Sequence, residues 1–394
     1  MKKILLASVA STMFAGAAFA DEIKIGVLLG FTGPAESLAE DMASGAEAAL
    51  KEISDSGKFL DGTTIATIRG DSTCTDAAVA TSVAERMITA DGVSGIIGAL
   101  CSGATGAILQ NVAVPNGMVQ FSPSATSPAL TTVEDNGLFF RASPSDARQG
   151  EIMAEILMEE GVKSVAVTYT NNDYGKGLSD AFESSFTKMG GTVTINAAHE
   201  DGKADYSAEI GALASAGGDL LVVIGYLDQG GKGIIRAALD TGAFDRFHLP
   251  DAMIGATIED EFGSELDGTM GQLPGADNPK GETLIQIGEA NGYNGMAAYA
   301  AESYDTGAVM GLAMQAAGST DPQVYKDFIM DVANAPGEKI YPGELEKALD
   351  ILSSGGEIDY VGGSALELIE PGEAAGSYRV IKTEGGKQVT VGYR

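Results

Sequence analysis

The chain has 394 residues, with 24 Lys and Arg against 55 Asp and Glu, and a formal net charge of −31. A surface this acidic repels the phosphate backbone of nucleic acids, and we therefore expect no nucleic-acid partner. The charge favours a soluble protein that stays apart from its neighbours, although a saline habitat would explain it equally well. It says nothing about a ligand.

The first twenty residues are typical of an export signal. Lys2 and Lys3 precede an apolar stretch, and Ala18-Phe19-Ala20 is a small-x-small cleavage site. The apolar stretch is short and Ala-rich, which disfavours the alternative of a permanent membrane anchor. Asp21 rather than Cys follows, which argues against a lipid anchor. We expect cleavage after Ala20, which leaves a chain long enough for two domains.

Two cysteines, Cys74 and Cys101, occur in the chain. Exported proteins meet an oxidising environment, so an even pair predicts a disulfide, with two free buried thiols as the alternative. Closing a loop of this length should contribute roughly 3–4 kcal/mol to stability.

Strand and helix patterns alternate through the first part of the mature chain. Residues 23–30 form an apolar run that ends in Gly, and residues 36–54 repeat apolar positions at intervals of three and four. Asp76 is placed to cap a helix with Val79, Val83 and Met87 on its apolar face. Further strands are predicted over 63–71, 93–100 and 117–122.

The same alternation restarts after residue 145. Helices are predicted over 146–161 and 177–191, with strands over 162–170, 192–200, 219–226 and 249–255. Three more helices are expected near 297–317, 321–333 and 342–354, and a terminal hairpin should turn at Gly385-Gly386. Alternation of this kind predicts an α/β fold with two doubly wound parallel-sheet lobes around a cleft.

Catalytic and metal-binding motifs are scarce. His199 and His248 are the only histidines, and neither has a second His at metal-ligand spacing. We find no nucleophile elbow, no dinucleotide-binding glycine pattern and no phosphate loop. No metal, cofactor or catalytic residue is therefore expected, and an enzyme is a distant second hypothesis.

Polar loops instead follow several predicted strands, at 101–106, 122–126, 171–175 and 226–231. Ligands of open α/β sheets bind at the carboxyl ends of strands. Hydroxyls and backbone N–H groups suit a carboxylate without Arg or Lys. Each loop alone would more often be simple helix capping, but together they favour a binding site.

The sequence resembles the leucine/isoleucine/valine-binding proteins of bacterial ABC transporters, which have the type I periplasmic-binding fold. The likeness is carried, in order, by "IGVLLGFTGP", "GALCSGATGA", "FSPSATSPAL", "FFRASPSDARQG", "NNDYGKG" and "IGYLDQGG". It implies a periplasmic receptor with lobe 1 over 21–142 and 271–362 and lobe 2 over 143–270 and 363–394.

The resemblance also implies roles for individual residues. Ser102 resembles the hydroxyl that receives the ligand carboxylate, helped by the 124–126 loop, and Asp146 an acid near the ligand amine. Tyr174 and Tyr226 of lobe 2 would cover the ligand on closure, and Tyr304 would line the pocket for the ligand side chain. Ser102 and Asp146 could instead simply cap the helices that follow them, and Tyr174 could be an ordinary turn residue. The expected ligand-binding residues are Leu38, Ser102, Ser124, Ala125, Thr126, Asp146, Tyr174, Tyr226, Thr257 and Tyr304.

Two departures from the family pattern concern the amine and the side chain. In the family, a Glu after a Gly-Pro pair holds the ammonium group of the ligand. The aligned position in this chain is nearest Thr257, and Glu259 or Asp251 could take the role of that Glu. Leu38 stands where some members have Trp. The carboxylate cradle is therefore predicted more firmly than the identity of the ligand.

The resulting hypothesis is a monomeric receptor that binds a small carboxylate-bearing solute, a branched-chain or other neutral amino acid, and docks on an ABC permease. The alternatives are a sensor that presents its ligand to a membrane receptor and, less favoured, a periplasmic hydrolase.

Overall fold

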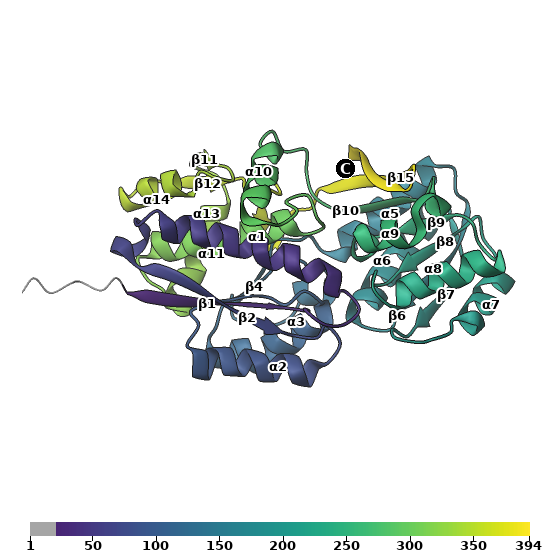
Figure 1. The fold of residues 1–394 in the computed structure, drawn as a ribbon, viewed down its shortest axis with the longest axis horizontal. Coiled ribbons are helices and arrows are strands. Elements are labelled where there is room, and N and C mark those ends of the chain that lie inside the picture. The colour runs from purple at the N-terminus through teal and green to yellow at the C-terminus, as the bar shows by residue number, and fades with distance from the viewer. Residues whose placement is uncertain (1–20) are drawn as a thin grey trace, which may run out of the picture.

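The computed structural model describes residues 21–394, so the expected leader and its cleavage site lie outside the described residues. The described chain forms two lobes, each built on one seven-stranded sheet with helices on its faces (Figure 1). The predicted fold class is confirmed. No helix in the described part of the chain is long and apolar enough to cross a membrane.

Lobe 1 has the sheet order β13-β14-β5-β4-β3-β1-β2, and the strands from β5 to β2 all pair in parallel. Its strands are β1 (Glu22–Leu29), β2 (Thr64–Asp71), β3 (Ile96–Gly98), β4 (Gln120–Ser122), β5 (Phe139–Arg141), β13 (Leu368–Ile369) and β14 (Glu373–Ala374). A separate two-stranded sheet consists of β11 (Glu338–Ile340) and β12 (Ile358–Tyr360).

The helices of lobe 1 come from both ends of the chain. They are α1 (Glu36–Asp55), α2 (Ala77–Arg86), α3 (Ser102–Ile108), α4 (Val114–Asn116), α10 (Gly281–Asn291), α11 (Ala300–Ala317), α12 (Pro322–Tyr325), α13 (Ile329–Ala333) and α14 (Leu345–Ser353). The apolar face predicted for α1 is buried, and α1 packs on α11 (Figure 1).

The side chain of Asp76 caps α2 as predicted, by accepting hydrogen bonds from the backbone N–H groups of Ala78 and Val79. The predicted apolar face of α2 is only partly right. Ala80, Ala84 and Met87 are buried, whereas Val79 is exposed. The sheet beneath α2 is approached closely, so small alanines face it and the larger valine points away.

Lobe 2 has the sheet order β16-β15-β10-β9-β8-β6-β7, in which β15 and β16 are antiparallel to their neighbours. Its strands are β6 (Ser164–Thr170), β7 (Thr192–His199), β8 (Leu220–Ile224), β9 (Phe247–Leu249), β10 (Met270–Pro274), β15 (Tyr378–Glu384) and β16 (Lys387–Tyr393). Its helices are α5 (Asp146–Glu159), α6 (Asp173–Lys188), α7 (Ser207–Ala216), α8 (Gly230–Thr241) and α9 (Ala256–Phe262).

Two predicted elements of lobe 2 need correction. The strand predicted over 249–255 is β9 (Phe247–Leu249) followed by a single helical turn (Asp251–Met253), because Pro250 removes a backbone donor from the strand. Helix α6 begins at Asp173, four residues before the predicted start, because the side chain of Asn172 caps it.

The chain crosses between the lobes three times, and two crossings differ from the predicted boundaries. Strand β10 pairs with β9 and β15, so residues 271–274 belong to lobe 2 rather than lobe 1. Strands β13 and β14 extend the sheet of lobe 1, so residues 368–374 belong there and not to lobe 2. The pairing of β10 with the distant β15 and the two-residue length of β13 and β14 leave no signal in a local stretch of sequence, so both crossings were predicted too early.

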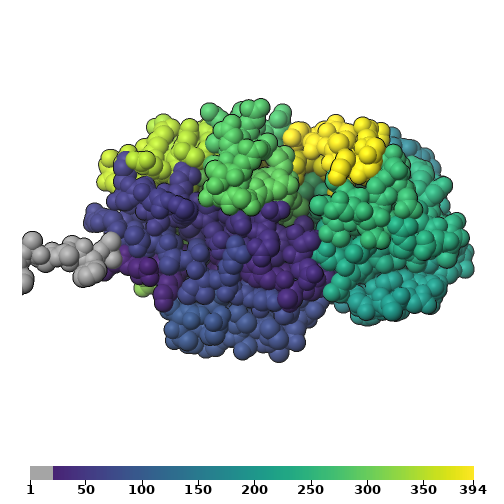
Figure 2. Space-filling view, viewed as in Figure 1, coloured from purple at the N-terminus to yellow at the C-terminus, as the bar shows by residue number. Residues whose placement is uncertain are grey.

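The lobes touch across the cleft in this structure, as the space-filling view shows (Figure 2). The backbone N–H of Asp228 donates to the Pro34 carbonyl at 3.1 Å, and its carboxylate accepts from the Ser37 N–H at 2.9 Å. The hydroxyl of Ser127 donates to the Asp173 carbonyl at 3.2 Å. One apolar cluster also contains buried residues of both lobes, so the conformation is closed.

Cys74 and Cys101 form the predicted disulfide, which joins the loop after β2 to the residue before α3. It therefore joins the loop after β2 to the loop after β3, and these two strands lie on either side of β1 in the sheet of lobe 1. The loop after β3 leads directly into Ser102, the first residue of α3.

Replacing both Cys74 and Cys101 by Ala should lower the free energy of unfolding by about 3 kcal/mol, because the unfolded chain regains the freedom of the closed loop. Chemical denaturation of the ligand-free mature protein measures the change. The reduced wild-type protein is the control and should unfold at the same denaturant concentration as the variant. An unchanged midpoint in both would contradict the prediction.

Candidate functional site

The loop after β4 is held in place by its own hydroxyls. The hydroxyl of Ser122 donates to the Ala99 carbonyl at 2.7 Å and accepts from the Ala125 N–H at 2.9 Å. The hydroxyl of Ser124 donates to the Leu100 carbonyl at 2.9 Å. These bonds fix the residue 122–125 backbone against the loop that leads into α3.

Arg141 fixes the other side of this loop. Its side chain is buried, and it donates to the carbonyls of Ala125 and Ser127 at 3.1 and 3.0 Å. It also forms an ion pair with Glu373 at 2.5 Å. The buried guanidinium therefore fixes the positions of the Ala125 and Ser127 carbonyls and, with them, the course of the loop.

Two hydroxyls beside this loop remain available as donors. The oxygen of Ser102 accepts a hydrogen bond from the Ser127 N–H at 3.1 Å, which leaves its own O–H free to donate. The Thr126 hydroxyl is buried and has no partner within residues 21–394. The side chain of Ser102 does not cap α3, since the capping position is Cys101 and makes no such bond. The capping alternative for Ser102 is therefore excluded.

Asp146 lies directly behind Thr126, because its backbone N–H donates to the Thr126 carbonyl at 2.8 Å. Its side chain is fully buried, and neither carboxyl oxygen has a partner among the described residues. Ser145, not Asp146, caps α5 with its side chain. Asp146 is thus free of a capping role and faces the inter-lobe region.

Asp251 is the second buried acid of the site, and its carboxylate accepts hydrogen bonds from two tyrosine hydroxyls. The hydroxyl of Tyr174 donates to it at 2.6 Å, and the hydroxyl of Tyr299 donates to its other oxygen. The ring of Tyr226 stacks on Tyr174 with centroids 5.4 Å apart. Asp251 and Tyr174 belong to lobe 2, whereas Tyr299 precedes α11 of lobe 1, so this cluster joins the lobes.

The two carboxyls influence each other. Burial, reinforced by the charge of Asp251, raises the pKa of Asp146 well above its ordinary value, while Thr126 and Arg141 oppose the shift. Burial also raises the pKa of Asp251, while the hydroxyls of Tyr174 and Tyr299 oppose the rise. Asp251 is therefore the better stabilised anion, and Asp146 is the acid that keeps a proton more readily.

Cavities flank this buried cluster on two sides. One, of about 360 Å³, is lined by Leu38, Leu227, Ile254 and Thr257 among others, and it lies between the lobes. Another, of about 520 Å³, is lined by Tyr226, Asn172 and Gly103 among others. Residues next in sequence to Tyr226 and Tyr299 line the first cavity, so it adjoins the cluster and receives Leu38 as expected.

The structure does not bring two of the expected residues to the cluster. Tyr304 is buried in the core of lobe 1, where its hydroxyl donates to Glu52 at 2.6 Å, so its predicted place in a side-chain pocket is wrong. The tyrosine that does reach the cluster is Tyr299, which immediately precedes α11 and has a positive φ of 63°. The sequence analysis missed it because both tyrosines stand in the same Ala-rich run.

Thr257 lies at the mouth of the first cavity, and its hydroxyl donates to Asp228 at 3.1 Å. Glu259 is engaged by the terminal hairpin, through Lys387 and the Gln388 N–H, both at 2.8 Å. Asp251 follows Pro250 directly, so an acid after Pro is present after all. Of the three candidates named from the sequence, only Asp251 lies in the buried cluster.

Both histidines lie in the core of lobe 2. His199 contacts the Thr168 hydroxyl at 2.9 Å and His248 contacts Gln272 at 2.7 Å, and burial lowers the pKa of each to about 4. Residues 21–394 contain no group of three or more His, Cys, Asp or Glu side chains placed to hold a metal ion.

Comparison with known proteins decides the family. The model of the periplasmic binding protein family matches residues 22–329. The chain belongs to this family. It is 32% identical over 348 residues to the Leu/Ile/Val-binding protein homolog 1 of Brucella melitensis, covering 86% of this chain and 89% of that protein.

Solved structures agree with this assignment at the level of the fold. The leucine binding protein of Thermotoga maritima MSB8 is similar with a TM-score of 0.78 and 24% identity, covering 94% of this chain and 98% of that one. A solute binding protein of R. palustris in complex with benzoate has a TM-score of 0.76 and 19% identity, covering 94% and 96%. Family membership implies a periplasmic location and places the chain among the solute-binding proteins.

Replacing Asp146 by Asn should stabilise the ligand-free protein at pH 8. A folded-state pKa above the unfolded value means that the unfolded chain binds fewer protons, so wild-type stability falls as pH rises. Asn removes this buried acid, so its advantage should reach about 1–3 kcal/mol at pH 8 and shrink toward pH 5. Melting temperatures measured from pH 5 to 8 test this.

The control for this prediction is Asp180→Asn, which changes an exposed acid on α6. Its melting temperature should follow that of the wild-type protein at every pH. A fall in stability of Asp146→Asn at pH 8 would show that the buried carboxylate is compensated in the ligand-free protein.

Proposed function

We propose that this chain is the solute receptor of an ABC importer and that it binds a free neutral amino acid between its lobes. The observation that supports this most directly is the pairing of neutral donors with two buried acids. Ser102 and Thr126 offer unengaged hydroxyls, and Asp146 and Asp251 offer carboxyl groups with no cationic partner bonded to them. A zwitterion complements both sets.

The ligand carboxylate would lie against the 124–126 loop. A buried carboxylate is stable when hydrogen bonds replace its hydration, and charge-assisted bonds are the strongest of these. Ser102 and Thr126 supply hydroxyl donors, whereas the hydroxyl of Ser124 is bonded to the Leu100 carbonyl and its N–H to the Ser122 hydroxyl, so Ser124 shapes the loop instead of donating to the ligand. Ala125 is held by Ser122 and Arg141, so its N–H and C=O are not free for the ligand.

The ligand ammonium would lie between Asp146 and Asp251. Asp146 has two unpartnered oxygens, and a cation nearby would lower its pKa and let it ionise. Asp251 has one hydrogen bond on each oxygen from Tyr174 and Tyr299, which hold it in a fixed orientation. An amine-free carboxylate, such as the benzoate of the R. palustris neighbour, would leave both acids without a countercharge.

Closure would follow from contacts that both lobes make. Tyr299 of lobe 1 and Tyr174 of lobe 2 share Asp251, and Asp228 bonds the start of α1. A ligand that bridges Thr126 and Asp251 adds to these contacts only in the closed form, so it favours hinge closure. The closed form would then dock on the permease as a monomer, without chemical change to the solute.

A sensor is the second candidate, since the same closed complex could be presented to a membrane receptor. A hydrolase has less support, because both histidines are engaged in the core of lobe 2.

A thermal-shift screen of the refolded, ligand-stripped protein tests the ligand class. Leucine, isoleucine, valine, threonine and alanine should raise the melting temperature, because a ligand at 100 times its dissociation constant adds about 2.7 kcal/mol. The matching amides and the amine-free carboxylates are the controls and should shift it little. Stabilisation by benzoate but by no amino acid would contradict the proposal.

Replacing Ser102 by Ala should weaken binding of the best amino acid of that screen about 10- to 100-fold. A hydrogen bond to a charged group contributes about 1.5–3 kcal/mol, and 1.4 kcal/mol corresponds to a factor of ten. Isothermal titration calorimetry measures the affinity. Ser184→Ala, an exposed change on the outer part of α6, is the matched control and should bind as the wild type does. Equal affinities in both variants would remove Ser102 from the site.

A further inference from the structure

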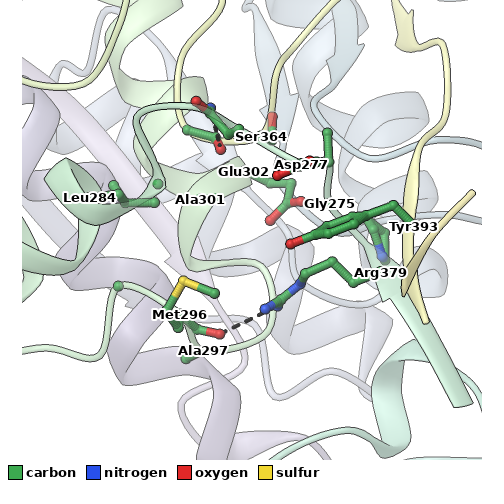
Figure 3. A pocket seen from close by; sticks show the side chains of 16 residues that line it. Gly275, Asp277, Leu284, Met296, Ala297, Ala301, Glu302, Ser364, Arg379 and Tyr393 are labelled. Atoms are coloured by element: carbon green, nitrogen blue, oxygen red, sulfur yellow. Dashed lines mark hydrogen bonds between the residues drawn. The ribbon is translucent and has the colours of Figure 1, made fainter. Parts of the chain in front are cut away.

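A buried acid that the binding site does not use lies beside the crossings between the lobes. Glu302, in the first turn of α11, is 2% exposed. Its carboxyl group makes no ion pair and no hydrogen bond with another residue across the described range 21–394. Figure 3 shows this carboxyl group between Gly275, Arg379 and Tyr393.

Two small cavities meet at Glu302. One, of about 90 Å³, is lined by the crossing residues Pro274 to Asn278 and by Gly363, Ser364, Arg379 and Tyr393 among others. The other, of about 130 Å³, is lined by Ala142, Pro144 and Gly275 and by residues 374–377 among others. All three crossings therefore contribute to the walls around one carboxyl group, and each cavity has room for a few water molecules.

The walls of the first cavity come from both lobes. Glu302 belongs to α11 of lobe 1, whereas Arg379 and Tyr393 belong to β15 and β16 of lobe 2. The guanidinium of Arg379 donates to the Met296 carbonyl at 3.4 Å and has no acid within 4.0 Å in the described chain. Any rotation of the lobes must change the distance between Glu302 and this cation.

The 90 Å³ and 130 Å³ cavities at Glu302 are the two hinge cavities, and three residues separate the first of them from the cleft between the lobes. Met296, Ala297 and Arg379 line both this 90 Å³ cavity and the 360 Å³ cavity between the lobes. Met296 belongs to lobe 1 and Arg379 to lobe 2, so a rotation that opens the cleft would separate them and would let water from the cleft reach Glu302.

Several charged groups face Glu302 from the surrounding elements. Burial raises its pKa to about 7, Arg379 lowers it and Asp305 on α11 raises it. Tyr393 lies on β16, Asp277 on the second crossing, and Glu367 lines the other cavity. Arg379 is the only one of these groups that favours the ionised form of Glu302.

We propose that Glu302 is a proton-binding site at the hinge, which couples closure of the lobes to the uptake of one proton. In the closed form the carboxyl group is enclosed and holds its proton. In the open form water surrounds it, and it releases the proton. The coupling requires only that the lobes move, whatever ligand binds between them.

The sign of the effect follows from the two protonation equilibria. Hydration in the open form returns the pKa of Glu302 toward its ordinary value of 4.5, while the closed form keeps it near 7. The closed form therefore binds more protons between these values. Closure is favoured at low pH, and this advantage is lost as pH rises through about 7.

Small-angle X-ray scattering of the ligand-stripped mature protein at pH 5.5, 6.5, 7.5 and 8.5 tests the proposal without any ligand. We expect the radius of gyration of the wild type to increase with pH, with a transition near pH 7. Glu302→Gln, which cannot ionise, should stay at its low-pH radius over the whole range. Asp146 and Asp251 contribute a trend of the same sign, so the difference between variant and wild type is the decisive quantity.

Two further variants sharpen the result. Glu289→Gln makes the same chemical change at an exposed acid of α10 that lines neither hinge cavity, and it should behave as the wild type does. Arg379→Gln removes the cation that favours ionised Glu302, so it should move the transition to higher pH. Equal pH dependence in wild type and Glu302→Gln, or a radius that does not change with pH in the wild type, would overturn the proposal.

Discussion

The burial of two carboxyl groups between the lobes is the constraint on which the rest of this structure depends. Asp146 and Asp251 are both fully buried, and no cation is bonded to either of them within the described chain. A buried charge without a countercharge costs free energy, so a buried acid either keeps its proton or ionises when a cation binds next to it. In the proposed function, a ligand that brings positive charge would relieve this cost in the closed form.

The scaffold around these acids is rigid where the ligand carboxylate is expected and composite where the ammonium is expected. Ser122, Ser124 and Arg141 fix the first region entirely within lobe 1. Asp251 instead receives Tyr174 from its own lobe and Tyr299 from the other. In the proposed function, a solute would bind first to the preformed surface of lobe 1, and its amine would complete the second region only when the lobes meet.

The hinge also contains a buried acid of one lobe that lies beside a polar group of the other lobe. Glu302 is enclosed by all three crossings, and its one favourable partner, Arg379, belongs to the opposite lobe. In both places an acid belongs to one lobe while a group that stabilises it comes from the other. In the proposed mechanism, protonation of these acids is therefore linked to closure of the lobes.

The sequence by itself determined the fold class and the disulfide, and it singled out the hydroxyl-rich loop after β4, because periodicity, cysteine count and hydroxyl-rich turns are local signals. Only the tertiary structure decided which acid and which tyrosine meet. Tyr299 and Tyr304 stand five residues apart in one Ala-rich run, yet the first reaches Asp251 and the second is bonded to Glu52 in a core. Likewise β13 and β14 are defined by their partner strand and not by their own two residues. Contacts between distant segments leave no periodic trace, so no window of sequence contains them.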